Sequence, residues 1–209
     1  SINKKLQEWY TYNEREFPWR KTSKTYDILV AEILLQRTKA SKVVPVYRKL
    51  LRSYPSFKKL SKANLASLEK LIHPLGLKYR AKILINLAKI FSESFNGRKL
   101  LTSAELLSLP GVGEYIANAM LCFRFNENIE VIDSNVIRIY ERILNLKFEG
   151  NYTKRANLIK PHAKKVAAFG NAINVNYALL DLSAAICLPK DPKCYKCPIN
   201  LKCKFYRKS

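Results

Sequence analysis

The sequence is poor in glycine, in negative charge and in long apolar runs. Its 209 residues include 6 glycines and 9 prolines, so the chain is neither low-complexity nor rich in linkers. No apolar run approaches the ~20 residues that a membrane-spanning helix needs. Residues 1–5 begin an amphipathic segment and lack the apolar block of a signal peptide. These absences predict a soluble intracellular protein without membrane contact.

Negative charge is scarce: 16 Asp and Glu residues stand against 38 Lys and Arg residues, which leaves a net charge of +22. Such an excess repels itself in a compact domain, so a polyanionic partner is its natural explanation. The alternative is a charge-rich solvated surface like that of some thermophile proteins, but those usually balance lysine with glutamate. The charge therefore favours a nucleic-acid-binding protein that resides with DNA in the cytoplasm or nucleoid.

Most of the chain shows the apolar periodicity of helices. Residues 28–35 are nearly all apolar, which is typical of a buried helix. The only strand-like stretch, residues 129–132, is too short to found a sheet. Neither an internal repeat nor a change of composition marks a domain boundary. The sequence therefore predicts an all-α fold.

A glycine-containing motif, Leu109-Pro110-Gly111-Val112-Gly113, separates two predicted helices. Its two glycines allow a tight turn with positive φ, and the next helix begins at once. The first N–H groups of a helix can bind phosphate, and the helix dipole adds to the attraction. The motif is thus either a phosphate-binding hairpin or an ordinary connection between helices that glycine punctuates.

Four of the five cysteines crowd into Cys187-x6-Cys194-x2-Cys197-x5-Cys203, and Cys122 stands alone. In an intracellular protein such crowding indicates a metal site rather than a disulfide framework. Four thiolates can bind one zinc ion or one iron–sulfur cluster, and the ligand type does not decide between them. Lysines and prolines fill the gaps between the cysteines, where the lysines are well placed to meet phosphate.

Two carboxylates stand in apolar surroundings. Glu32 lies within residues 28–35, and Asp133 follows the strand-like stretch. A buried carboxylate without a partner is costly, so such groups serve as helix caps, as salt-bridge partners or in chemistry. Asp133 can simply N-cap a helix that starts just after it. Both residues are also candidates for catalysis.

Together and in order, these motifs resemble those of the helix–hairpin–helix DNA glycosylases, the HhH-GPD superfamily. That group includes endonuclease III, the adenine-mismatch glycosylases and the thymine–guanine mismatch glycosylases. The resemblance extends over essentially the whole chain, and the cysteine spacing is that of the family's [4Fe–4S] cluster. Besides the hairpin and the cysteines, it rests on Phe17-Pro18-Trp19-Arg20, Glu32-Ile33-Leu34-Leu35-Gln36-Arg37-Thr38, Gly76-Leu77-Lys78-Tyr79-Arg80-Ala81 and Val131-Ile132-Asp133-Ser134-Asn135-Val136-Ile137-Arg138.

The resemblance implies two helical domains with a DNA-binding cleft between them. Residues 21–132 would form a six-helix domain with the hairpin, and residues 1–20 would pack with residues 133–209 as the iron–sulfur cluster domain. Asp133 would then lie at the junction and face the cleft. The implied partner is double-stranded DNA with a mismatched or damaged base, bound by a monomer.

In the family, the residue 18 positions before the catalytic aspartate separates the mechanistic classes, and 133 − 115 = 18 places Tyr115 there. Bifunctional members carry lysine at this position and form a Schiff base, so Tyr115 implies a monofunctional enzyme. Adenine-mismatch enzymes usually carry a small hydroxyl residue, whereas tyrosine resembles the thymine–guanine mismatch enzymes. The implied activity is removal of thymine or uracil opposite guanine in base excision repair.

The resemblance also implies a role for each candidate residue. Asp133 would stabilise an oxocarbenium-like sugar as the N-glycosidic bond breaks, and Glu32 would act on the leaving base or on water. Tyr115 would border the pocket of the flipped base. Gln36 and Arg37 would fill the gap that this base leaves in the duplex. The hairpin residues that would contact DNA are Leu109, Gly111, Val112 and Gly113.

Other functions stay open at this stage. One is an adenine glycosylase acting opposite guanine or 8-oxoguanine, although such enzymes commonly add a domain after the cysteines. A broader uracil or damaged-pyrimidine glycosylase also fits, because details of the pocket decide the base. A non-catalytic helix–hairpin–helix DNA-binding protein would explain the charge and the hairpin. It would give no reason for Glu32, Asp133 and Tyr115 at family spacing.

Overall fold

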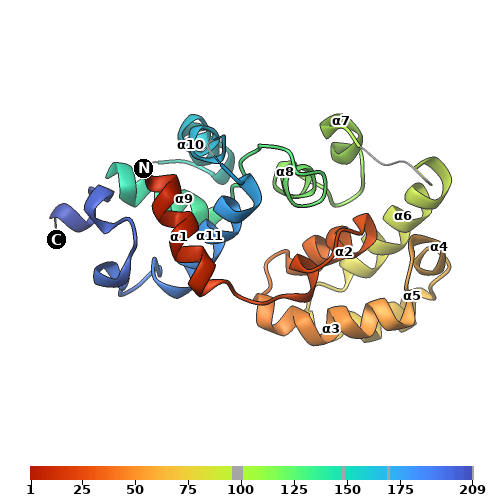
Figure 1. Ribbon diagram of the computed structural model, residues 1–209. Helices are drawn as coiled ribbons and strands as arrows, with labels where there is room; N and C mark the ends of the chain where they lie inside the picture. The colour runs from red at the N-terminus through yellow and green to blue at the C-terminus, as the bar shows by residue number, and fades with distance from the viewer. Residues whose placement is uncertain (96–100, 147–148, 169, 209) are drawn as a thin grey trace. The chain divides into compact units, whose positions relative to one another are not determined.

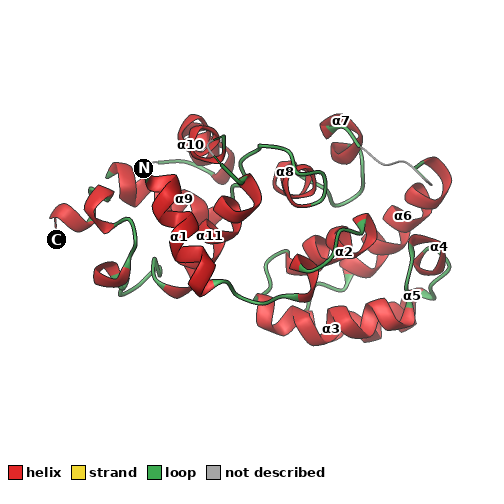
Figure 2. Cartoon of the chain, viewed as in Figure 1, coloured by secondary structure: helices red, strands yellow, loops and turns green. Residues whose placement is uncertain are grey.

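The computed structural model describes residues 1–95, 101–146, 149–168 and 170–208, which form helices and loops and no strand (Figure 1; Figure 2). The all-α prediction is confirmed. Residues 129–132 form no ladder, and one side chain of a neighbouring helix hydrogen-bonds two of their backbone groups. Asn176 Oδ1 accepts from the Val131 N–H at 2.9 Å, and Asn176 Nδ2 donates to the Ile129 carbonyl at 2.9 Å. Among the described helices, none combines the length and the apolarity of a membrane span.

The contacts between Cα atoms divide the chain into two units. Unit 1 comprises Ser1–Arg15 and Asn126–Ser209, and unit 2 comprises Glu16–Phe125. Unit 1 is therefore discontinuous in sequence. Compared with the expected domains, residues 16–20 fall in unit 2 and residues 126–132 fall in unit 1. The expected roles of the two domains, one carrying the hairpin and the other the iron–sulfur cluster, stay predictions.

Helix α2 (Thr25–Leu35) forms the core of unit 2, where it contacts α3, α6 and α8. It is apolar on every side because it is covered on every side: Tyr26 and residues 28–34 are all buried. The ring of Tyr26 meets Phe57 edge-on, and Phe57 stacks on Phe91 with centroids 4.1 Å apart. The other elements are α3 (Ala40–Ser53), α4 (Phe57–Leu60), α5 (Leu65–Ile72), α6 (Tyr79–Ser94), α7 (Ser103–Leu107), α8 (Glu114–Phe123), η1 (Pro18–Arg20) and η2 (His73–Leu75).

Helix α11 (Ala172–Ala185) is the core of unit 1, where it contacts α1 (Ile2–Asn13), α9 (Ser134–Leu144) and α10 (Tyr152–Ala167). Its buried residue Asp181 holds the segment that follows α1. One carboxylate oxygen accepts from Arg15 Nε at 2.6 Å and the other from the Arg15 N–H at 3.0 Å. The cysteine segment follows α11 as the 3-10 turns η3 (Cys194–Lys196), η4 (Asn200–Lys202) and η5 (Tyr206–Lys208).

Candidate functional site

The turn between α7 and α8 is built around Gly111. The Val112 N–H donates to the Leu109 carbonyl at 3.2 Å, Pro110 is the second residue of the turn, and Gly111 is the third with φ +76°. This is the pattern of a type II turn, which needs glycine at its third position. A Cβ at Gly111 would also lie 2.6 Å from Cγ2 of Ile83 on α6. Leu109 and Val112 are buried and anchor the turn in the core of unit 2.

Gly113 differs from Gly111 in its backbone conformation. Its φ of −100° and ψ of −177° are extended backbone that any residue adopts, and a Cβ there would meet nothing within 4 Å. Of the two glycines of the motif, Gly111 is therefore the one that uses the positive φ that the motif allows. It is the N-cap of α8 and has no side chain to accept from the first turn of that helix. The first N–H groups of α8 thus face no capping side chain at Gly113.

The segment between α2 and α3 meets this turn. Gln36 follows the last residue of α2, and its Nε2 donates to the Gly111 carbonyl at 2.9 Å across 75 residues of sequence. Arg37 is exposed and has φ +55°, a left-handed conformation that is uncommon outside glycine. The structure thus brings together the Gln36–Arg37 segment and the turn at Gly111, which were predicted separately to bind DNA.

Of the predicted catalytic residues, two belong to unit 2. Glu32 lies in α2 and is buried, with 5% of its surface exposed. Tyr115 lies in the first turn of α8 and is half-buried. Because α2 packs against α8, both residues stand on the same pair of packed helices. Asp133 belongs to unit 1.

Asp133 is the N-cap of α9, as the sequence had suggested. Its Oδ1 accepts from the N–H groups of Asn135 and Val136 at 2.9 and 2.7 Å. Its Oδ2 accepts from Asn135 Nδ2 at 2.7 Å. Asn135 Oδ1 accepts in turn from Arg138, whose Nε donates to the Cys187 carbonyl at 3.0 Å. Sequence reasoning did not single out Asn135 or Arg138, although both stand in the segment that carried the family resemblance.

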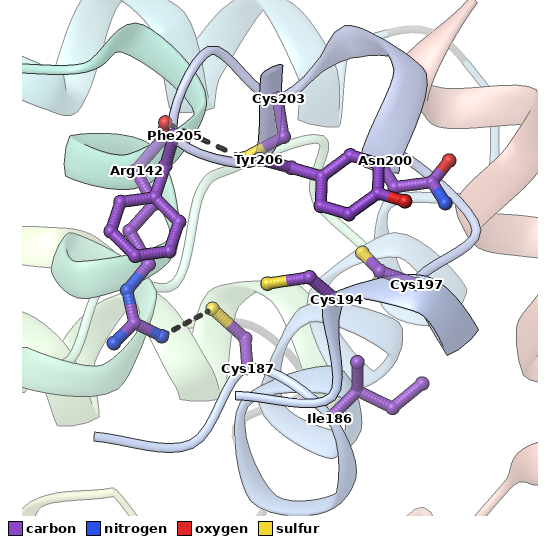
Figure 3. A pocket seen from close by; sticks show the side chains of 9 residues that line it. All are labelled: Arg142, Ile186, Cys187, Cys194, Cys197, Asn200, Cys203, Phe205 and Tyr206. Carbon is purple, nitrogen blue, oxygen red and sulfur yellow. Dashed lines mark hydrogen bonds between the residues drawn. The ribbon is translucent and has the colours of Figure 1, made fainter. Parts of the chain in front are cut away.

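All four clustered cysteines line one hollow in unit 1, and all four are free thiols (Figure 3). The hollow encloses about 280 Å³, counting the part that is open to solvent. Figure 3 shows their sulfur atoms around a common space, with Phe205 and Arg142 at its edge. Among the described side chains, no three His, Cys, Asp or Glu residues are placed to hold a metal ion.

Arg142 of α9 supports this hollow from one side. Its Nη1 donates to Cys187 Sγ at 3.3 Å and to the Leu188 carbonyl at 2.7 Å. Its own carbonyl accepts from the Cys203 thiol at 3.4 Å, and its guanidinium lies over the ring of Phe205. The sequence offered no signal for this residue, because its partners lie 45 and 61 positions away.

The hollow also shifts the acidity of its thiols. Burial, with a smaller contribution from the neighbouring cysteines, raises the pKa of Cys197 to about 11, and a hydrogen bond from the Ile199 backbone opposes the increase. Burial also raises the pKa of Cys194, whereas the positive charge of Arg142 opposes the increase. Thiolates confined together without a cation repel one another, so this donor set suits a bound cationic group.

The chain is similar along nearly its whole length to known repair proteins. Residues 30–165 match the family described as HhH-GPD superfamily base excision DNA repair protein. The thymine-DNA glycosylase of Aeropyrum pernix is 37% identical over 99% of this chain and 94% of its own length. The thymine/uracil-DNA glycosylase of Methanothermobacter thermautotrophicus is 35% identical over 97% of this chain and 91% of its own length. An adenine DNA glycosylase of Buchnera aphidicola is 32% identical over 96% of this chain, but only 57% of that protein is covered.

Solved structures agree with these matches. A thermostable thymine-DNA glycosylase superposes with a TM-score of 0.90 at 32% identity, and covers 99% of this chain and 95% of its own. A non-covalent endonuclease III–DNA complex superposes with a TM-score of 0.81 at 19% identity, which indicates a shared fold.

Proposed function

The chain belongs to the HhH-GPD superfamily of base excision DNA repair proteins, and we propose that it is a monofunctional glycosylase that removes thymine or uracil opposite guanine. One observation carries the proposal: the similarity to thymine- and thymine/uracil-DNA glycosylases extends over 97% of the chain or more. Tyr115 supports the monofunctional class, because it stands where bifunctional members of the family carry the lysine that forms a Schiff base.

We assign the central electrostatic role to Asp133. As the N-glycosidic bond breaks, the sugar gains oxocarbenium character, and a fixed negative charge stabilises it. The hydrogen bonds from Asn135 and Val136 hold the carboxylate in one orientation before the substrate arrives. Such preorganisation is effective because no reorientation is needed as charge develops.

We assign supporting roles to Glu32 and Tyr115. Glu32 is a carboxylate in the apolar core of unit 2, the kind of surroundings in which enzymes keep groups that exchange protons with a leaving base or with water. Tyr115 is half-buried in the first turn of α8, and its ring offers a face on which an extruded pyrimidine can stack.

For DNA binding we propose the two segments that meet at Gly111. The turn and the N-terminus of α8 offer backbone N–H groups to a phosphate. The loop formed by Gln36, Arg37 and Thr38, which we call the wedge loop, would fill the gap left by the flipped base. We further propose that unit 2 is the hairpin domain and unit 1 the cluster domain, and that a monomer acts on duplex DNA inside the cell.

We propose that Cys187, Cys194, Cys197 and Cys203 hold a [4Fe–4S] cluster. Four free thiols around one hollow, with an arginine donating to one sulfur, fit a four-thiolate ligand set. When bound, the cluster would supply cross-links between parts of the cysteine segment. Around it, exposed lysines of the segment are placed to meet phosphate: Lys190, Lys193, Lys196, Lys202 and Lys204.

Single-turnover assays on labelled duplexes test the proposed activity. Duplexes with G·T, G·U, A·G and A·8-oxoguanine pairs are incubated with the protein and run on gels with and without alkali. We expect breaks at G·T and G·U that appear only after alkali, because a monofunctional enzyme leaves an intact abasic site. Excision of adenine alone would instead favour the second candidate, an adenine glycosylase, which the Buchnera relative supports. Absence of excision from every duplex would refute both.

A further inference from the structure

Arg80 is a fully buried arginine near the start of α6, with 0% of its surface exposed. Burying a cation is costly, and burial lowers the pKa of this guanidinium. Its partners are neutral oxygens. Nη1 donates to the Leu34 carbonyl at 2.5 Å and to the Gln36 carbonyl at 3.3 Å, and Nη2 donates to Thr38 Oγ1 at 3.1 Å. Nη2 also donates to the carbonyls of Leu75 and Gly76 at 2.9 and 3.2 Å.

These acceptors gather around one segment of the chain. Leu34 belongs to the last turn of α2, whose final carbonyls have no partner within the helix. Gln36 and Thr38 are the two residues on either side of Arg37 in the wedge loop. A single guanidinium thus binds the end of α2 and the two loop residues on either side of Arg37, which a shorter or less branched donor cannot do.

The held residues flank a strained one. Arg37 has φ +55°, and a left-handed residue with a side chain persists only where its surroundings impose it. The Thr38 N–H donates to the Leu35 carbonyl at 3.0 Å, and Gln36 donates to the Gly111 carbonyl. Arg80 adds the bonds from the interior, so that Arg37 is the exposed residue of an otherwise anchored loop.

We propose that Arg80 is a positioning residue that preorganises the wedge loop, so that Arg37 enters the gap opened in the duplex without first having to fold. The inference rests on the DNA-binding role proposed for this loop. It extends that role to a residue that touches no DNA. Preorganisation of this kind raises affinity for the gapped duplex alone, because only there is the loop conformation used.

The test compares two duplexes that differ only in the gap. One carries a tetrahydrofuran abasic analogue opposite guanine, and the other is fully paired. We expect the wild type to prefer the abasic duplex, and Arg80→Met to reduce that preference about tenfold while its affinity for the paired duplex stays within about twofold. Arg37→Ala should show the same pattern, and the double variant should lose no more than either single one. Arg80→Lys, which keeps the charge and three donors, should restore part of the preference.

Two further variants keep the test decisive. If Arg80→Met does not fold, Thr38→Val removes one bond of Arg80 to the loop, together with the bond from the Thr38 hydroxyl to the Gln36 carbonyl at 3.2 Å. The other bonds of Arg80 stay in place, and we expect a smaller loss of the same kind. The control is Lys89→Met, which also removes one positive charge but from an exposed position of the same helix. This variant should leave the preference for the abasic duplex unchanged.

The outcomes are distinct. An unchanged preference in a folded Arg80 or Thr38 variant would overturn the inference, as would equal losses for both duplexes or a wild type without preference. Binding is measured without excision, so a protein that removes no thymine or uracil would refute the proposed function and leave this result to be judged separately.

Discussion

Asn135 Nδ2 donates to Asp133 Oδ2 at 2.7 Å, while Asp133 Oδ1 accepts from two backbone N–H groups of α9. The two oxygens of one carboxylate are therefore held by different groups. Capping α9 requires only Oδ1. A substitution that keeps an acceptor at Oδ1 but removes the negative charge therefore distinguishes a structural role of Asp133 from a catalytic one.

For Asp133→Asn we expect a folded protein with little base excision. Asparagine caps a helix about as well as aspartate, so the melting temperature should change only slightly. Loss of a preorganised charge lowers the rate by on the order of 10²–10³. Single-turnover excision from a G·U duplex measures the rate, and calorimetry measures the melting temperature. A fully active variant would leave Asp133 with the capping role alone.

For Tyr115→Lys we expect strand cleavage that the wild type lacks. A lysine in the first turn of α8 would offer an amine nucleophile in the position that bifunctional relatives use. The variant should give nicked DNA without alkali and a covalent adduct after borohydride reduction. Tyr115→Met, an unbranched residue without an amine, is the control and should give neither product. A wild-type protein that already forms the adduct would contradict the monofunctional class.

The two glycines of the hairpin should respond in opposite ways. Gly111→Ala should lower the free energy of unfolding by about 1–2 kcal/mol, because its φ is +76° and Ile83 occupies the space of a Cβ. Gly113→Ser should keep the stability or raise it, because serine can cap α8. Since the serine oxygen would then compete with phosphate for the same N–H groups, we expect a severalfold loss of duplex affinity. Urea unfolding and binding titrations over a range of salt concentrations measure both effects. Equal stability of the two variants would contradict the assignment of the turn.

For the cysteine segment we expect bound iron and sulfide, with a broad absorbance near ~400 nm typical of thiolate-ligated [4Fe–4S]. Arg142→Gln removes the positive charge beside Cys187 and the N–H bond to its sulfur, so this absorbance should decay faster in air. Arg155→Gln is the control, because Arg155 pairs with Glu141 and does not line the hollow. Stoichiometric zinc without iron in the purified protein would refute the cluster.

Much of this protein follows from patterns that are local in the sequence. Apolar periodicity predicts the helices, because each amphipathic or apolar segment must bury the face that it carries. The cap by Asp133 is predicted from its position, since the N–H groups that donate to its carboxylate lie two and three residues away. The crowding of four cysteines into one segment likewise indicated a shared site, and the four side chains line one hollow.

Tertiary structure decided what depends on distant partners. The side chain of Asn176 hydrogen-bonds the Val131 N–H and the Ile129 carbonyl, so these two backbone groups have partners without a neighbouring strand. Gly111, and not Gly113, takes the positive φ of the turn, and Ile83 leaves no room for a side chain there. Arg80 and Arg142 look like ordinary basic residues of a basic chain, and only the carbonyls and the sulfur around them assign their roles. The physical reason is the same in each case: at least one deciding partner, a hydrogen-bonding group or the Ile83 side chain, lies dozens of positions away and leaves no periodic trace in the sequence.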